Sequence, residues 1–520
     1  MKRTVLALLV TAGVIHCGTD NVDVKPTQTR RPDGGVELPP APPPLPGCDN
    51  KLLPTENACV IHESAGIFVR ASAPEGGDGT RLKPLKDLSA AIGAAVSDGR
   101  RVYVCAETYE AQLTFGDGVN VFGYFDCSTA DWKVTDRRAK IAPKEGVAAV
   151  AKGIAKPTRI EALDIEAADG KAPGDSSIGL IAQDSGGLSF LNTRIAAGKG
   201  RDGVNGKDAV QLTASADTQG LASRSETNDA RDGNSTPYQT NRRGGVGTCS
   251  GAPGHDAGNG GDGAKSATSD CTGTTTMFGC SGATVSNPGN CFAGVSILGL
   301  PTAATATTAK GATFTTNAEP GQAGVRGTDG ASPPAQLGID GFKAGNGTAA
   351  TDGTPGQGGG GGASLIHAGA CSSRKQWWGE TGSGGGAGGC PGLAAGPGTG
   401  GGSSVAVVSK ASAIKFDGRC VIASSSGGNA GRAGAFSTPT PGGLPGSASA
   451  GVASGAPGGG GGEAGLSGHG SAGYSIGIAW SGAKPASEVT PTVGAAGTQA
   501  APRGNEAPGA AGLAKDVYEF

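Results

Sequence analysis

SIGLI at residues 177–181, SVAVV at residues 404–408 and SIGIA at residues 475–479 look like copies of one short β-strand. Each copy begins with serine, continues through apolar residues, and reaches a glycine cluster after 21, 23 and 19 residues, respectively. A fourth and weaker copy starts at Val295. Repeat units of about this length are typical of solenoids, in which each unit buries its apolar face only against its neighbours. The copies therefore predict short strands that stack along one axis.

The segment before these copies has the features of a cap. Residues 85–95 carry apolar side chains at the spacing of one amphipathic helix, and strand-like runs at 67–69 and 102–105 flank them. A single helix followed only by strands suits a cover over the first strands of a solenoid. Without such a cover, the first strands would expose unpaired backbone groups and apolar surface.

This segment also carries a resemblance to a known family. The order GGDGT (76–80), KPLKDLSAAI (83–92), VYVCAETYEAQLTF (102–115) and GVNVFGYFDC (118–127) resembles the start of bacterial β-helix domains of the pectin-lyase-like type. The version it resembles most is the one in PGRS-type glycine-rich lipoproteins. The match covers residues 66–132 and rests on order and spacing. It implies an all-β fold, a right-handed parallel β-helix (solenoid) with an N-terminal capping helix and long Gly-rich loops.

Glycine dominates the composition, with 98 Gly and 32 Pro among 520 residues. After each copy, glycines recur three residues apart, at 200–206, 321–330, 428–434 and 462–468. Collagen needs an unbroken triplet with abundant proline, which these short runs lack. Calcium-binding nonapeptides need a repeated GGxGxD, and the fragment at 260–263 is not repeated. Two interpretations remain for these runs: ordered polyproline-II-like loops packed on the solenoid, or disordered loops.

The first residues predict export. Lys2 and Arg3 precede an apolar run, residues 4–15, that is too short to span a bilayer and stops near Cys17. A cysteine at this place resembles the lipobox of bacterial lipoproteins, although His16 stands where a small residue is expected. We expect lipidation at Cys17, with secretion through another cleavage site as the alternative. The proline-rich segment that follows would be an extended tether.

These features divide the chain into five parts. They are a signal peptide with lipobox (1–17), a Pro-rich disordered tether (18–60), N-terminal β-helix rungs with the capping helix (61–206), a polar, Cys-containing insertion (207–290), and Gly-rich β-helix rungs and loops (291–520).

The cysteines predict disulfides, since these are the usual state of cysteine in an exported chain. Twelve cysteines leave eleven once Cys17 is lipidated, so at least one is unpaired within the chain. The candidate pairs are Cys105–Cys127, whose members each end a strand-like run, and the local loops Cys48–Cys59 and Cys371–Cys390. The expected remainder is one of three pairings among Cys249, Cys271, Cys280 and Cys291, with Cys420 left over.

No catalytic constellation is present in the sequence. β-Helix lyases and glycosidases need clustered carboxylates on neighbouring strands. The acids on the strand-like runs are isolated and alternate with apolar residues, as on the solvated face of a strand: Glu161, Asp164, Glu166 and Asp184. No CxxC or CxxH spacing supports a zinc site. We therefore expect no enzyme activity, no catalytic residues, no metal and no cofactor.

Trp377 and Trp378 form the one feature that points to a ligand. Adjacent tryptophans between a basic cluster and a Gly-rich run can stack on sugars or contact a partner. The alternative is that they cap a local core inside the Cys371–Cys390 loop.

The sequence as a whole predicts an exported, lipid-anchored protein of the outer membrane or cell surface, with a structural or adhesive role and without catalysis. Its expected partners are the membrane, through the anchor, and a surface polysaccharide or another surface protein. The formal net charge of −2 gives no footprint for nucleic acid. The alternative function is a polysaccharide-binding or polysaccharide-degrading (lyase- or glycosidase-like) β-helix protein.

Overall fold

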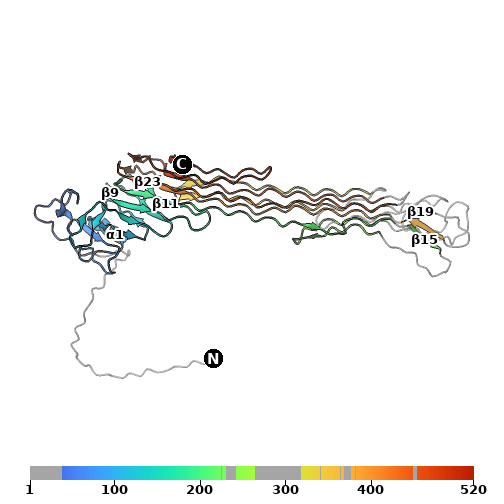
Figure 1. The fold of residues 1–520 in the computed structure, drawn as a ribbon, viewed down its shortest axis with the longest axis horizontal. Coiled ribbons are helices and arrows are strands. Elements are labelled where there is room, and N and C mark those ends of the chain that lie inside the picture. Colours follow the sequence, from blue (N-terminus) through green and yellow to red (C-terminus); the bar gives the residue numbers. More distant parts are fainter. Residues whose placement is uncertain are drawn as a thin grey trace, which may run out of the picture.

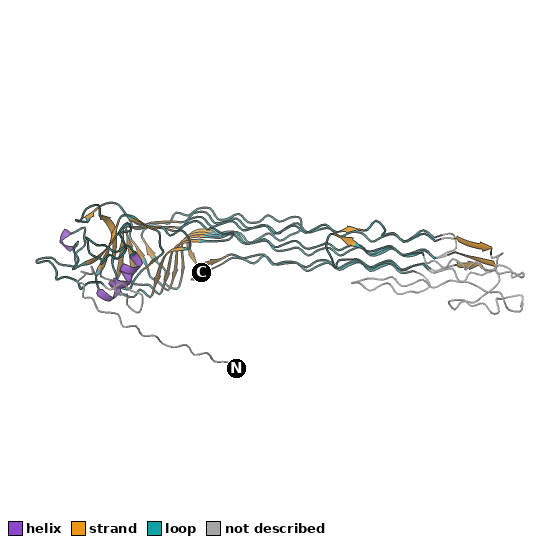
Figure 2. Cartoon of the chain, turned by 90° about the horizontal axis from the view of Figure 1, so that it is seen from below, coloured by secondary structure: helices purple, strands orange, loops and turns teal. Residues whose placement is uncertain are grey.

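The computed structural model of the chain has two parts, a head built of strands and a long rod (Figure 1). It describes residues 38–223, 225–229, 242–263, 318–339, 341–362, 365–367, 376–380, 382–448 and 454–520. The head lies at one end, and the rod carries the strands β15 and β19 at the other (Figure 1). Most of the rod contains neither helix nor strand (Figure 2).

The head contains three parallel sheets. The first has the strand order β1 (Gly66–Val69), β2 (Arg101–Cys105), β5 (Val121–Asp126), β9 (Thr158–Glu161), β12 (Leu188–Leu191), β22 (Lys415–Phe416) and β25 (Ala486–Ser487), with β6 (Lys133–Val134) antiparallel to β5. The second has the order β3 (Thr108–Tyr109), β7 (Ala139–Ile141), β10 (Leu163–Glu166), β13 (Arg194–Ala196) and β23 (Val421–Ala423). The third has the order β4 (Leu113–Thr114), β8 (Val147–Lys152), β11 (Ser177–Gln183), β21 (Ser404–Lys410), β24 (Ser475–Ser481) and β26 (Ala514–Glu519).

The apolar core lies between these sheets, and each strand points the side chains of one of its faces into that core. Equivalent positions of paired strands form rows of buried side chains, since parallel strands in register place like residues next to each other. One row per sheet illustrates this: Ile160, Phe190 and Phe416; Ile141, Ile165, Ile195 and Ile422; Leu180, Val407 and Ile478. The rings of Phe190 and Phe416 are stacked with centroids 5.3 Å apart.

The three sequence copies pair with one another in register, as their similarity predicts. Ser177 pairs with Ser404, and Ser404 pairs with Ser475, on β11, β21 and β24. The intervals between the copies are nevertheless very unequal. Partners on the first two copies are 227 residues apart, as in the hydrogen bond between Ser176 and Ser403. The chain therefore leaves the head after β13, travels along the rod, and returns to the same register.

The corner after four of the six strands of the third sheet is left-handed. The residues that directly follow β8, β11, β21 and β24 all have positive φ: Gly153 (68°), Asp184 (49°), Ala411 (48°) and Gly482 (81°). Glycine adopts this conformation at little cost, whereas a residue with a Cβ is strained there. Ala411 therefore occupies a position that suits glycine.

One α-helix is present in the described residues. Helix α1 (Leu88–Asp98) begins three residues later than predicted, because the Asp87 side chain caps it by accepting a bond from the Ala90 N–H. Gly99, with φ 76°, ends it in the left-handed conformation. The helix packs against β1, β2 and β4, at the end of the head where the first strands lie. No helix of the described residues is long and apolar enough to cross a membrane.

Residues 38–60, predicted to belong to a disordered tether, pack on this same end. Their one regular element is the 3-10 turn η1 (Ala58–Val60). Leu38 contacts the main core, and Leu53 contacts a second buried cluster around Tyr103 and Trp132. The Arg101 guanidinium holds the segment by donating to the backbone carbonyl of Leu52 at 2.6 Å and to that of Asn50.

The predicted right-handed parallel β-helix with Gly-rich loops is wrong for this chain. The parallel strands belong to separate sheets, and no continuous solenoid or closed barrel is found among the described residues. The physical reason lies in the glycine runs. A solenoid would use them only to turn between strands, whereas here they form a second structure that has its own hydrogen bonds and extends away from the head (Figures 1 and 2).

The rod is a bundle of extended segments joined sideways by backbone hydrogen bonds. Its single segments are residues 198–223, 318–332, 344–362, 382–403, 426–448 and 454–474, and residues 242–263 and 494–513 each add a hairpin of two extended arms. Bonds between two segments recur every third residue, as from the N–H groups of Gly200, Gly203 and Gly206 to Ser426, Asn429 and Arg432. Three residues per turn is the period of polyproline II conformation, whose rise of about 3.1 Å gives segment 382–403 a length of roughly 65 Å.

Residues 200–211 show how a three-residue period sorts side chains into rows. The glycine row, at 200, 203 and 206, donates to segment 426–448. The next row accepts from backbone N–H groups of that segment, in the pairs Asp202 with Asn429, Asn205 with Arg432, Asp208 with Ala435 and Gln211 with Thr438. The third row, at 201, 204, 207 and 210, is exposed to solvent. Polar side chains thus satisfy N–H groups that no neighbouring carbonyl reaches.

The central segment 382–403 is the richest in glycine because it has neighbours on several sides. A Cβ on Gly384, Gly385 or Gly386 would overlap the carbonyl oxygen of Arg243, Gly359 or Gly443, respectively. Each of these carbonyls belongs to a different segment. Three successive positions must therefore all be glycine, since each one faces a separate backbone at close approach.

Small antiparallel sheets complete the described fold. The strands β14 (Thr213–Ala214) and β16 (Cys249–Ser250) pair antiparallel, and so do β17 (Gln336–Gly338) and β18 (Gly341–Lys343). The β17–β18 hairpin lies at the head, where Leu337 and Ile339 pack on the outer cluster formed by residues of β11, β21 and β24. The strands β15 (Ser225–Asp229), β19 (Leu365–His367) and β20 (Gln376–Glu380) form an antiparallel sheet at the far end of the rod (Figure 1).

Two neighbouring glycines test the packing of the rod. We expect Gly461→Ala to lower the free energy of unfolding by about 1–3 kcal/mol, the usual range for overpacking, because its Cβ would overlap the Cys390 carbonyl. Gly460→Ala is the matched control, since the nearest atom to its Cβ is 3.8 Å away. Denaturant unfolding followed by circular dichroism measures both variants, and equal losses would contradict this packing.

The left-handed corner gives a second test. Ala411→Gly is expected to raise the free energy of unfolding by about 1 kcal/mol, because φ 48° no longer strains a Cβ. Gly482→Ala, at the equivalent corner after β24, should lower it by a similar amount. A destabilised Ala411→Gly variant in the same unfolding assay would show that the corner carries no strain.

Candidate functional site

The far end of the rod carries the aromatic pair that the sequence singled out. Trp377 and Trp378 lie on β20, where they pair in register with Asn228 and Thr227 of β15. Only the backbone of this sheet is described, so a ligand contact by the two side chains stays a prediction. Because β20 pairs with β15 and β19, the fold places it at the opposite end of the molecule from α1 (Figure 1).

The chain connects β20 directly to the rod, which supports the position of β20 at its far end. Strand β20 is followed, after Thr381, by the central segment 382–403, which leads into β21 of the head. The carbonyl or N–H groups of Gly385 and Gly388 bond to Gly245, Gly261 and Gly258 of the adjacent segment. The sheet of β15, β19 and β20 is therefore joined through the chain to segment 382–403, the most enclosed segment of the rod.

Three disulfides are present in the described residues. Two are pairs expected from the sequence, Cys48–Cys59 and Cys105–Cys127. The third is Cys249–Cys390, which joins residues 141 positions apart and ties segment 242–263 to the central segment. The disulfides indicate an oxidising, extracellular or exported setting.

The third disulfide corrects two predictions. Cys390 does not pair with Cys371, and Cys249 does not pair within the group of four cysteines. Proximity in sequence suggested both pairings, whereas the antiparallel rod brings distant residues side by side. Cys371, Cys271, Cys280, Cys291 and the predicted lipidation site Cys17 lie outside the described residues.

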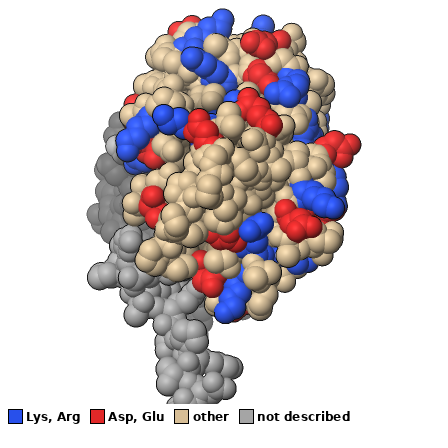
Figure 3. All heavy atoms as spheres, turned by 90° about the vertical axis from the view of Figure 1, so that its left-hand side faces the viewer, with Lys and Arg blue, Asp and Glu red and all other residues tan. Residues whose placement is uncertain are grey.

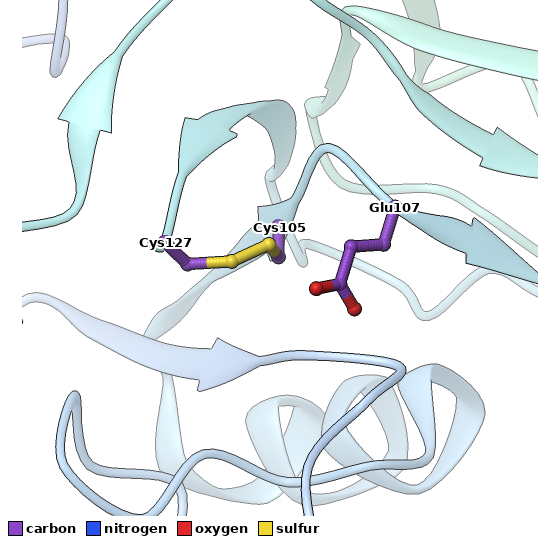
Figure 4. Close-up of side chains that lie close together, drawn as sticks. All are labelled: Cys105, Glu107 and Cys127. Carbon is purple, nitrogen blue, oxygen red and sulfur yellow. A yellow bond between two sulfur atoms is a disulfide. The ribbon is translucent and has the colours of Figure 1, made fainter. Parts of the chain in front are cut away.

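Cys105, Glu107 and Cys127 lie close enough together to suggest a metal site (Figure 4). The two sulfur atoms are bonded to each other, so neither is a thiolate ligand. The Glu107 carboxylate accepts bonds from the Arg70 side chain at 3.2 Å and from the Ser72 N–H at 2.9 Å. This group is therefore a disulfide beside an ion pair, and its donor set does not fit a metal.

The acids on the strands are engaged by arginine. Arg159 bonds to Glu161 at 2.8 Å, and Arg194 bonds to both Asp164 at 2.7 Å and Glu166 at 3.0 Å. Burial opposes ionisation of Glu166, but hydrogen bonds from Arg194 and Lys140 outweigh it and hold the pKa of Glu166 below its usual value. A carboxyl group in this state is a poor general acid near neutral pH. The fourth acid, Asp184, lies at a left-handed corner.

A groove beside α1 is one feature of the head that could receive a small molecule. Its volume is about 470 Å³; Tyr109, Leu113 and Ile141 form an apolar floor, and Glu75, Lys86 and Glu110 lie at its rim. Lys86 pairs with Glu75 at 2.9 Å, and Lys144 pairs with Glu110 at 2.7 Å. The end face of the head intersperses acidic and basic side chains around an uncharged area (Figure 3). This face has no concentrated charge that would select a ligand.

Sequence reasoning missed one contact, the pair of His469 and Glu506. Their side chains are 1% and 3% exposed, and the imidazole Nε2 lies 3.2 Å from the carboxylate. Both residues occur in Gly-rich runs with no neighbouring motif, so the sequence offered no signal for their pairing. Among the other histidines, His255 contacts Asp352 at 3.1 Å near the surface.

Cys420 is free and buried, as the leftover cysteine of the sequence was expected to be. Its sulfur lies 3.3 Å from the Phe190 carbonyl and 3.2 Å from the Asp417 carboxylate. Burial raises the pKa of its thiol to about 11.

Because the thiolate is the reactive form, alkylation of Cys420 at pH 8 should be at least about 100-fold slower in the native protein than in the unfolded chain. Peptide mass spectrometry measures both rates; similar rates would mean that the thiol is accessible.

No family model, curated protein sequence or solved structure matches this chain, so its proposed function depends on the geometry described above.

Proposed function

We propose that the chain is an exported, lipid-anchored surface protein that holds a binding tip away from the cell, in a structural or adhesive role without catalysis. The observation that carries the proposal is the position of β20 at the end of a rod of roughly 65 Å. A spacer of this length serves a protein that must contact something beyond the cell envelope. The disulfides support export, and the sequence of residues 1–17 supports an anchor at Cys17.

The arrangement of the two ends supports this function further. The predicted anchor precedes residue 38, which contacts the head, whereas Trp377 and Trp378 lie on the sheet at the other end of the rod. A load or a ligand at the tip is therefore separated from the head by the length of the rod. Aromatic side chains at such a tip suit a polysaccharide or the surface of another protein.

A polysaccharide-binding role without adhesion is the second candidate, since it depends on the same tryptophans. Degradation of polysaccharide has less support, because the strand acids Glu161, Asp164 and Glu166 are engaged by arginine.

The proposal is tested with cells that display the chain. We expect Cys17→Ala to release the protein from membranes into the medium, measured by fractionation and by mass spectrometry of the N-terminus.

We expect Trp377→Ala/Trp378→Ala to leave display unchanged and to lower attachment to polysaccharide-coated surfaces about tenfold, since each stacked aromatic contributes about 0.5–1.5 kcal/mol. Gly460→Ala, which changes the rod without a clash, serves as the control for attachment.

Two results would contradict the proposal. The first is recovery of the mature wild-type chain in the cytoplasm. The second is cleavage of pectin-, alginate- or chitin-like polymers by the purified protein, which would favour the enzyme alternative.

A further inference from the structure

A groove with a volume of about 660 Å³ lies where the head continues into the rod. It is lined by four stretches of chain, residues 169–173, 199–204, 426–429 and 495–498. The first three follow β10, β13 and β23 of the second sheet, and the fourth follows Thr492, which bridges to β23. Because these strands are stacked in parallel, the stretches leave the sheet side by side. The volume lies within the range of about 300–1,000 Å³ that is typical of small-molecule sites.

Backbone N–H groups hold three side chains of this groove in place. The Asp169 Oδ1 accepts a bond from the Lys199 N–H at 2.6 Å. The Asp202 Oδ1 accepts from the Asn429 N–H at 2.7 Å, and the Asn429 Oδ1 accepts from the Thr498 N–H at 2.9 Å. Each bond joins neighbouring stretches and uses one polar atom of the side chain. The three side chains are therefore fixed in the free protein, so a ligand loses little affinity to ordering them.

Each fixed side chain keeps a second polar atom for a ligand. The Oδ2 atoms of Asp169 and Asp202 are acceptors, and the Nδ2 of Asn429 is a donor. None of these three atoms has a hydrogen bond to another described residue. The side chains of Lys199 and Arg201 also line the groove, and neither pairs with an acid in the described part of the chain. The groove therefore offers both donors and acceptors.

The charges of the groove are balanced, and this balance decides between classes of ligand. Asp169 and Asp202 contribute two negative charges, and Lys199 and Arg201 contribute two positive charges. A polyanion would meet two fixed carboxylates, and a polycation would meet two unpaired cations, so each would be opposed by like charge. Hydroxyl groups donate and accept, so a neutral polyhydroxylated ligand can use every one of these groups. Neutral oligosaccharides have this chemistry.

We propose that this groove binds a neutral oligosaccharide. The free carboxylate oxygens of Asp169 and Asp202 accept from its hydroxyl groups, and the side chains of Lys199, Arg201 and Asn429 donate to them. The site is separate from β20, which lies at the other end of the rod (Figure 1). It therefore goes beyond the proposed function and does not depend on the tryptophans or on the anchor.

Titration with trisaccharides, followed by saturation-transfer NMR, tests the site in the full chain carrying Trp377→Ala/Trp378→Ala. This background removes stacking at the tip. Among the described residues that line the groove, none is aromatic, so we expect cellotriose, maltotriose or mannotriose to bind weakly, with a Kd on the order of 1 mM. Trigalacturonate, a carboxylated trisaccharide, should bind at least about tenfold more weakly. No binding of the three neutral probes, or tighter binding of trigalacturonate, would overturn the proposal.

Two matched variants locate the binding. Asp202→Asn keeps the oxygen that accepts from the Asn429 N–H and replaces the free acceptor with a donor, so the affinity should fall about tenfold. Asp208→Asn makes the same change outside the groove, where Asp208 accepts from the Ala435 N–H at 2.6 Å, and it should bind like its parent. Denaturant unfolding should show equal stability for the two variants.

Unchanged affinity in Asp202→Asn, or an equal loss in Asp208→Asn, would place the saccharide elsewhere and refute the groove. Binding that is present in the wild-type chain and lost in Trp377→Ala/Trp378→Ala would also refute the groove, but it would support a binding tip. Failure of the groove and failure of the proposed function are therefore distinguishable.

Discussion

The rod depends on one constraint, the need of polyproline II segments to approach one another closely enough for backbone hydrogen bonds. This conformation has no internal hydrogen bonds, so every buried N–H must find a partner on a neighbouring segment. Where the neighbour offers a carbonyl, the donor is often glycine, as at Gly200 and Gly203, although Ala209 and Thr399 donate in the same way. Where the neighbour offers no carbonyl, one of its polar side chains accepts, as Asp202 and Asn205 do. Glycine content, polar rows and enclosure of segment 382–403 all follow from this requirement.

Proline fits the same rule, because it needs no acceptor. Along the contact between segments 344–362 and 382–403, Asn346 accepts from the Gly400 N–H and Asp352 accepts from the Ala394 N–H, both at 2.7–2.8 Å. Midway between these two contacts the antiparallel register brings Pro397 opposite Ala349, which has no acceptor side chain. An acceptor side chain on one segment thus lies opposite an N–H group of the next segment, and no acceptor is needed opposite a proline.

The sequence was informative wherever a structural feature depends on local pattern. The β11, β21 and β24 strands and their register follow from the three similar stretches, and α1 follows from its apolar spacing. The glycine triplets were recognised, but their role was not, because a triplet does not reveal which distant segment it contacts. The pairing of Cys249 with Cys390 and of His469 with Glu506 depends on those same distant contacts. A continuous solenoid was therefore predicted for a chain that divides its residues between sheets and a bundle.

The path of the central segment has a mechanical consequence. Since β20 at the tip leads through residues 382–403 directly into β21, tension applied at the tip runs along this segment into the middle of a sheet. The sideways hydrogen bonds of the bundle lie across that direction and are loaded together in shear. Separating segment 382–403 from its neighbours requires many of these hydrogen bonds to break at once. In addition, the Cys249–Cys390 disulfide ties segment 242–263 covalently to segment 382–403. The molecule is built to resist pulling along its length.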